Sequence, residues 1–328
     1  MTTSRPNILE LHIRHFLHEA IERGRTKKED MKRNLLIQLS SKILSHEKDV
    51  IIDRCKKYLD ELSNHLKKLS STVVRIDIES TSRVIIDVSG PMGWLIDEIG
   101  LAWDPVLDAP YISSSSLRGV FRHSSIVIFT ETLISSQKLA LDKALKMARF
   151  ITDVLFGSPS GAVQPPAHIS MFCLTDAYPV SAEPGSSLVD PDVLSPHYSL
   201  TEKTFKEHEV SPTPIVFLTL PPKMIMRFFV YPNYRISKEI GKAMKQPYPE
   251  SLSVILEKIS SSSDTSTAEK SCKECIEILK NIKTEETFEQ LLKDIVSNAV
   301  SNIGLGGKTS SGYGYFRIKS FEVGGEEW

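Results

Sequence analysis

The sequence predicts an α+β fold, and three observations lead to that expectation. Apolar residues recur at helical spacing over the first 70 residues and in several later segments. Between these segments lie runs of β-branched residues with the alternation of strands. From residue 71 on, the order is strands, helix, strands, helix and strand with long insertions, which is typical of an α+β domain. We therefore expect a helical extension over 1–70 and one α+β domain over 71–328.

The N-terminal extension is predicted to be helical because apolar side chains line one face of each of three segments. These side chains are Leu9, Ile13, Phe16, Leu17 and Ala20, then Leu35, Leu39 and Ile43, then Tyr58, Leu62, Leu66 and Leu69. Basic pairs such as Lys27-Lys28 and Lys67-Lys68 occupy the other faces. Such pairs usually form a solvated face, and direct contact with RNA is the alternative.

Strands are predicted where β-branched and aromatic residues alternate with other residues. These segments are 73–78, 83–88, 169–178, 215–220, 224–231 and 313–323. The segments 215–220 and 224–231 resemble a hairpin around Pro221-Pro222. Residues 181–214 show little periodicity, and so long an irregular stretch inside a domain is often functional.

Helices are predicted between these strands. Serines at 113–116 are good N-caps for a helix that carries Arg118 and Arg122 one turn apart on the same face. A second helix runs from about Leu141 to Leu155, and two more flank a serine-rich linker at 260–267. The elements fit a ferredoxin-like or RNA-recognition-type core, whose topology periodicity alone does not determine.

The most informative stretch is a glycine-rich segment between a helix and the last strand. It has five glycines within eleven positions, 304–314, together with Lys308 and several hydroxyl groups. Backbone that turns this tightly lets another molecule approach, and its N–H groups suit phosphate. Gly307-Lys308-Thr309 matches the end of a nucleotide-binding P-loop, but Asn302 stands at that motif's first glycine. A P-loop also follows a strand and opens a helix, which is the reverse of the order here.

Composition limits the other classes of function. The chain has 40 basic and 41 acidic residues, so RNA binding would need a localised basic surface rather than net charge. No apolar run is long enough to span a membrane and no signal peptide is evident, so we expect a cytoplasmic protein with no membrane partner. Cys272 and Cys275 form a single C-x-x-C on a predicted helix without further ligands, so we expect no metal and no cofactor.

Three segments together resemble one family. Residues 110–122, Pro-Tyr-Ile-Ser-Ser-Ser-Ser-Leu-Arg-Gly-Val-Phe-Arg, are similar to a conserved segment of RAMP-superfamily CRISPR proteins, with Ser114 in place of a usual glycine. Residues 304–314 are similar to the C-terminal glycine-rich loop of that superfamily. Residues 176–179 and 192–198 narrow the resemblance to the sixth-named subunit of the type III-B, or Cmr, effector complex.

The resemblance implies a non-catalytic RNA-binding subunit that caps the protein filament and holds CRISPR RNA near its 3′ end. Its partners would be CRISPR RNA, the guide–target RNA duplex and other Cmr subunits. A thumb-like insertion at about 185–214 would fold over the duplex. The candidate RNA-binding residues are Ser115, Ser116, Arg118, Arg122, His197, Tyr198, Gly304, Gly306, Gly307, Lys308, Thr309, Ser310, Ser311, Gly312 and Tyr313.

Two further alternatives concern the RNA chemistry. Tyr315, Arg317 and Lys319 share one face of the last predicted strand, as in single-strand RNA binding, although any exposed sheet face would look similar. A metal-independent, guide-processing endoribonuclease of the same superfamily would need a general base, for which His123 and His197 are the candidates. Asp97 lies in a loop like that of the superfamily's target-cutting subunits, but we expect no catalytic residue here.

Overall fold

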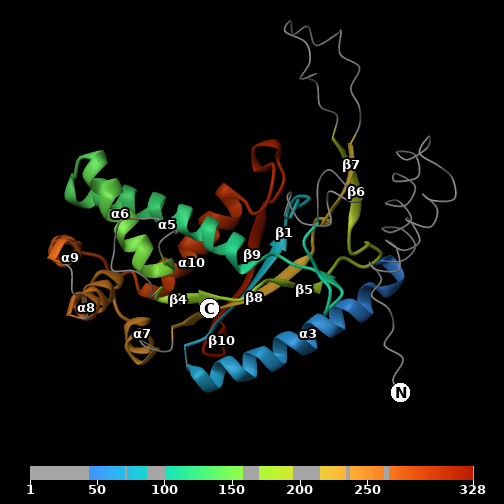
Figure 1. Ribbon diagram of the computed structural model, residues 1–328, viewed down its shortest axis with the longest axis horizontal. Coiled ribbons are helices and arrows are strands. Elements are labelled where there is room, and N and C mark those ends of the chain that lie inside the picture. The colour runs from blue at the N-terminus through green and yellow to red at the C-terminus, as the bar shows by residue number, and fades with distance from the viewer. Residues whose placement is uncertain are drawn as a thin grey trace, which may run out of the picture.

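The computed structural model describes residues 44–70, 72–86, 101–157, 170–194, 215–233, 237–261 and 266–327. Its centre is an antiparallel sheet with helices on both faces (Figure 1). The strands follow the order β10-β9-β1-β8-β4, and β5 also pairs with β8. They are β1 (Val74–Ser80), β4 (Phe172–Leu174), β5 (Tyr178–Ser181), β8 (Ile225–Pro232), β9 (Phe316–Val323) and β10 (Glu326–Glu327). The mixed helices and antiparallel strands confirm the α+β class.

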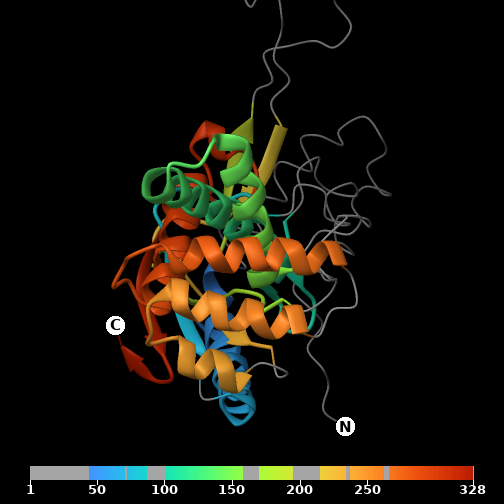
Figure 2. The same cartoon turned by 90° about the vertical axis from the view of Figure 1, so that its left-hand side faces the viewer.

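One face of the sheet carries α5 (Ser114–Gln137), α6 (Leu141–Phe156) and α10 (Phe288–Asn298) (Figure 1). Aromatic side chains fill this interface, with ring centroids of Phe121 and Phe228 5.9 Å apart and those of Phe172 and Phe288 5.7 Å apart. Figure 2 shows α7 (Ser237–Ala243), α8 (Tyr248–Ser261) and α9 (Ser266–Lys280) stacked in orange at one end of this layer. The predicted helix at 141–155 and the pair around the 260–267 linker are confirmed.

The opposite face is partly covered by α3 (Leu44–Leu69), which packs on β5 and β8. Its buried apolar residues are Ile51, Ile52, Cys55, Leu59 and Leu66. The predicted stripe was therefore wrong in part, because Tyr58 and Leu69 are exposed and the i, i+4 series that starts at Ile51 faces the sheet. The other predicted N-terminal stripes lie outside the described residues.

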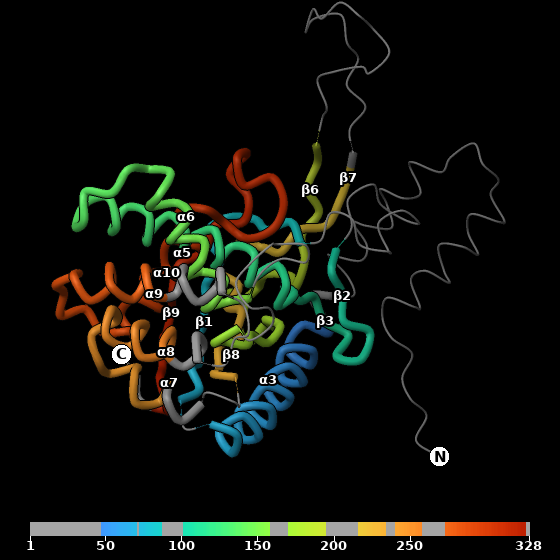
Figure 3. Tube along the Cα trace, turned by 60° about the vertical axis from the view of Figure 1, so that its left-hand side comes forward, coloured from blue at the N-terminus to red at the C-terminus, as the bar shows by residue number. Residues whose placement is uncertain are grey.

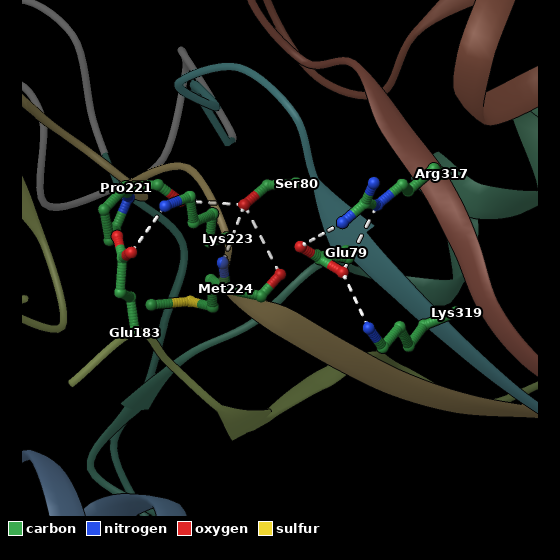
Figure 4. Close-up of polar contacts among 8 residues, drawn as sticks. All are labelled: Glu79, Ser80, Glu183, Pro221, Lys223, Met224, Arg317 and Lys319. Atoms are coloured by element: carbon green, nitrogen blue, oxygen red, sulfur yellow. Dashed lines mark hydrogen bonds and ion pairs between the residues drawn. The ribbon is translucent and has the colours of Figure 1, made fainter.

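The segments 215–220 and 224–231 are extended as predicted, but they do not form a hairpin with each other. The strand β7 (Ile215–Thr219) pairs with β6 (Asp190–Leu194), whereas β8 pairs within the main sheet. Ser80 holds the connection between them. Its hydroxyl donates to the Pro221 carbonyl at 2.8 Å (Figure 4). Its own carbonyl accepts from the Lys223 N–H at 2.7 Å. Pro221 and Pro222 lack the N–H groups that a ladder needs, so the chain turns away.

Two other predicted strands are interrupted. Residues 169–178 form β4 and β5 rather than one strand, because Asp176 accepts a hydrogen bond from the Ser114 N–H and Ala177 pairs with Ile112. Residues 83–86 make single-residue bridges on two sides instead of a strand, from Val84 to Leu220 and from Ile85 to Gly307. A short hairpin of β2 (Trp103–Asp104) and β3 (Ala109–Pro110) lies beside α3. Within the described ranges, no helix has the length and apolar character needed to cross a membrane.

Candidate nucleic-acid interface

The glycine-rich loop closes on itself between α10 and β9. After α10 the chain makes a wider helical turn (Ala299–Ile303), which ends where the Gly304 N–H donates to the Ala299 carbonyl. The Leu305 N–H then donates to the Gly314 carbonyl at 2.7 Å, so the two ends of the loop meet. The residues with left-handed φ angles are Gly304, Gly306, Lys308, Gly312 and Gly314.

Two of these glycines are required by the protein's own packing. A Cβ atom at Gly306 would lie 2.0 Å from the Ile85 carbonyl oxygen, and one at Gly314 would lie 2.1 Å from the Leu305 carbonyl oxygen. The close approach predicted for these positions is therefore made by the backbone of the chain itself. Gly312 differs, because nothing lies within 4 Å of the position its Cβ would take.

The outer turn of the loop presents backbone donors to solvent. Lys308 has φ 56° and ψ 36° and precedes a helical turn, Thr309–Ser311. In the described part of the chain, no backbone hydrogen bond uses the N–H of Lys308, Thr309 or Ser310. When a residue in left-handed conformation is followed by residues in helical conformation, their successive backbone N–H groups form a concave site that binds anions. Lys308, Ser310 and Ser311 are also exposed, so a cation and two hydroxyl groups lie beside these donors.

The start of α5 is capped by the chain itself. Ser113 is the N-cap, as predicted, and its hydroxyl accepts from the Ser116 N–H at 3.3 Å. Asp176 accepts from the Ser114 N–H at 2.6 Å, and the Ser115 and Ser116 hydroxyls each lie 2.9 Å from that of Ser113. A carboxylate therefore already occupies the place where this helix would favour an anion. RNA contact by Ser115 and Ser116 stays a prediction.

The two arginines of α5 have different surroundings. Arg122 donates to the Asp153 carboxylate and the Gly157 carbonyl, which joins α5 to the end of α6. Arg118 is partly exposed, and no carboxylate of the described residues lies within ion-pair distance of it. Of the two, Arg118 is thus the arginine whose charge is available to a ligand.

The sheet face that α3 leaves open is filled by ion pairs. Arg317 donates to Glu79 at 2.8 Å and the Lys319 ammonium lies 3.5 Å from the same carboxylate (Figure 4). The hydrogen bond from Arg317 lowers the pKa of Glu79 below its ordinary value, and the charges of both cations add to this. Tyr315 donates its hydroxyl to the Thr309 carbonyl. The charges predicted for an RNA-binding sheet face are therefore largely compensated within the protein.

The remaining candidates divide by position. His197, Tyr198 and Asp97 lie outside the described residues. His123 is exposed on α5, and the structure shows no hydrogen bond or ion pair from it to another described residue. Among the described residues, no three histidine, cysteine, aspartate or glutamate side chains come together as metal ligands would.

Sequence reasoning missed one contact beside the glycine-rich loop. Asp192 of β6 accepts from the Tyr313 hydroxyl at 2.8 Å and from Arg83 at 2.9 Å. Burial alone would raise the pKa of Asp192, but the hydrogen bonds from Arg83 and Tyr313 lower it below its ordinary value. Asp192 belongs to the segment 192–198 that carries part of the family resemblance, but no pattern in the sequence indicated that it would contact Tyr313.

The chain is similar to several known proteins. The curated protein CRISPR system CMR subunit Cmr6 of Saccharolobus solfataricus is 29% identical over 230 residues, which are 70% of this chain and 69% of that protein. A chain in the cryo-EM structure of the type III-B Cmr-beta complex bound to cognate target RNA has a TM-score of 0.51 and 24% identity. That alignment covers 92% of this chain and 77% of the other, and it shows a common fold. The crystal structure of Cmr6 from Pyrococcus furiosus aligns with a TM-score of only 0.35 and 15% identity, over 76% of this chain and 98% of the other.

The family assignment rests on a match to a family model. A family model described as the RAMP superfamily matches residues 96–317, which is more than half of the chain. The match includes the start of α5, β6, β7 and the whole glycine-rich loop. The chain therefore belongs to the RAMP superfamily and, within it, resembles the Cmr6 subunit.

Proposed function

We propose that the protein is a non-catalytic, RNA-binding subunit of a type III-B CRISPR effector complex. It caps the subunit filament and holds CRISPR RNA near its 3′ end during antiviral, RNA-guided target recognition. Its partners are CRISPR RNA, the guide–target RNA duplex and the other Cmr subunits. The observation that carries the proposal is the outer turn of the glycine-rich loop, where exposed Lys308 adjoins three N–H groups without backbone acceptors. The similarity to Cmr6 supplies the biological setting.

The strand order supports a ferredoxin-like core. The strands β9, β1, β8 and β4 are neighbours in that order, and each pair is antiparallel. The chain forms α5 and α6 between β1 and β4, and α10 between β8 and β9, which is a βαββαβ arrangement. The β6–β7 ribbon is inserted before β8 and projects from the body of the molecule (Figure 1). We assign β6 to the thumb-like insertion at about 185–214, of which 185–194 are described, and β7 follows directly after that insertion.

The proposed RNA surface is centred on the loop and includes Arg118. Phosphate contacts from lysine, arginine and backbone N–H groups fix the position of RNA without reading its sequence. Such contacts suit a subunit that must accept any guide. Ser310, Ser311 and Gly312 are exposed on the same turn as Lys308 and complete the surface.

Two lysine variants test the proposal. Lys308→Ala should weaken binding of single-stranded RNA about tenfold, because it removes a charge-assisted contact. It should also reduce the slope of log affinity against log salt by about one unit, with no dependence on RNA sequence. Titrations of labelled RNA at several salt concentrations measure both quantities.

Lys223→Ala is the matched control. Lys223 also has a left-handed φ angle, and its charge is paired with Glu183 (Figure 4). The control therefore removes the same charge from the same kind of backbone position, but away from the loop. Equal affinity and equal salt slope in the two variants would remove the loop from the RNA site.

A further inference from the structure

The glycine-rich loop and the β6–β7 ribbon are joined through one short segment, residues 83–86. On one side, Val84 and Leu220 exchange two backbone hydrogen bonds of 3.1 and 2.9 Å, which attach the end of β7. On the other side, the Gly307 N–H donates to the Ile85 carbonyl at 2.9 Å. The Gly314 N–H donates to the Arg83 carbonyl at 2.8 Å. The segment is therefore hydrogen-bonded to the ribbon and to both halves of the loop.

Side chains also connect the glycine-rich loop to the β6–β7 ribbon. Asp192 of β6 accepts from both Tyr313 of the loop and Arg83, and its side chain is 17% exposed. Under this contact lies a small apolar cluster of Ile85 and Phe217, which are fully buried. Leu194 and Tyr313 pack against that cluster, and the rings of Phe217 and Tyr313 lie 6.4 Å apart. Figure 3 shows the loop, in red, next to the base of β6 and β7.

The ribbon needs this contact because it has only two strands. A two-stranded ribbon is marginally stable in water by itself and takes its direction from what it packs against. Here that support includes the Val84–Leu220 backbone bonds at the end of β7, the small cluster, and one carboxylate that accepts two hydrogen bonds. Bonds to a charged group are worth more than neutral ones, so the contact can set the direction of the ribbon.

We propose that Asp192, Tyr313 and Arg83 form a latch that holds the β6–β7 ribbon in one direction on the glycine-rich loop, so that RNA bound at the loop also positions the ribbon. The three side chains act as positioning residues. The docking of ribbon and loop is a property of the free protein, and only the step that involves RNA rests on the proposed function.

Hydrogen exchange in the full-length protein without RNA tests the docking. Asp192→Asn should speed exchange about tenfold at the Gly307 and Gly314 amides, which are far along the chain from the substitution. Tyr313→Phe, which removes only the hydroxyl, should speed exchange at the Leu220 amide by a similar factor. Because both variants break one contact, the double variant should exchange no faster than the more affected single variant.

Controls separate the latch from a general loss of stability. Glu183→Gln makes the same change of charge in the exposed pair with Lys223 and should leave Gly307 and Gly314 unaffected. Amides of α10 should keep their wild-type rates in every variant. The proposal is overturned if each substitution speeds exchange only in its own segment. It is also overturned if α10 is affected to the same degree as the loop.

A second hydrogen-exchange experiment adds a single-stranded RNA oligonucleotide to the same variants. RNA should slow exchange at Gly307 and Gly314 in the wild type and, through the latch, at Leu220. In Asp192→Asn the protection at Leu220 should be lost. Protection of the wild-type loop without protection of Leu220 would overturn the coupling. No protection anywhere would instead count against RNA binding at the loop and leave the result in the free protein to decide the docking.

Discussion

Alanine at Gly306 tests why this loop needs glycine. Both Gly306 and Gly312 have left-handed φ angles, of 92° and 91°. At Gly306 a Cβ atom would lie 2.0 Å from the backbone oxygen of Ile85, whereas at Gly312 it would meet nothing within 4 Å. The pair of variants therefore separates the cost of the φ angle from the cost of the close contact.

The expected costs can be worked out from these two features. A left-handed alanine costs about 1–2 kcal/mol, and this applies to both variants. In Gly306→Ala the Ile85 carbonyl must also move, which strains the packing by about 1–3 kcal/mol and weakens its hydrogen bond from Gly307. Gly306→Ala should thus lower the free energy of unfolding by about 3–5 kcal/mol and Gly312→Ala by about 1–2 kcal/mol. The entropy that alanine removes from the unfolded chain is the same for both and cancels in the comparison.

Urea unfolding of the two variants measures this difference. Gly306→Ala should unfold at a clearly lower urea concentration than Gly312→Ala, with similar slopes. In RNA titrations Gly306→Ala should also bind more weakly, because the displaced loop no longer presents its N–H groups together. Equal stabilities would refute the reasoning, since they would mean that the Ile85 carbonyl yields without cost.

Two further predictions concern charges. Asp77→Asn should lower the free energy of unfolding by about 3 kcal/mol or more, because Asp77 accepts two hydrogen bonds of 2.7 and 2.8 Å from Arg227, whose side chain is 17% exposed. Arg317→Gln, which removes a 63% exposed partner of Glu79, should lower it by less than about 1 kcal/mol. Equal losses of stability in urea unfolding would contradict this. Because the folded pKa of Asp192 lies below its ordinary value of 3.8, its contribution to stability should be complete above that pH and be lost as the pH falls through the folded pKa. The stability difference between wild type and Asp192→Asn should therefore shrink in acid, and a constant difference down to the lowest pH would count against this.

Local patterns in the sequence were sufficient for α10 and for most of β9, which bury one face along a continuous segment. The helix α10 follows its apolar spacing and begins at a capping box formed by Thr287 and Gln290. The strand β9 alternates as predicted as far as Lys319. Beyond it, a register shift opposite Asp77 and Ile78 puts Phe321 and Val323 on the apolar face. A bulge depends on the partner strand, so periodicity within one segment could not predict it.

Contacts between distant segments were beyond the reach of periodicity. The pairing of β7 with β6 instead of β8 depends on where Ser80 holds the turn, which no spacing within 215–231 records. Asp192 and Tyr313 meet although they are 121 residues apart. At the candidate site, glycine and lysine content was enough to find the loop. It did not show which glycines face the chain itself and which face solvent.

The position of the proposed RNA surface follows from what occupies the sheet. Domains of the RNA-recognition type bind single strands on an open sheet face, where exposed aromatic rings stack on bases. In this chain the helix α3 covers β5 and β8 on that side, and the described part of β1 and β9 next to it carries the Glu79 and Asp77 ion pairs. Stacking RNA there would require separating charges that already neutralise one another. The outer turn of the glycine-rich loop has no such competitor, since the N–H groups of Lys308, Thr309 and Ser310 have no backbone acceptor in the described chain and Lys308 is exposed. We therefore propose that the phosphate contacts lie on the loop, next to the β6–β7 ribbon that Asp192 contacts. In this proposal the sheet supports the loop and the ribbon and keeps them together.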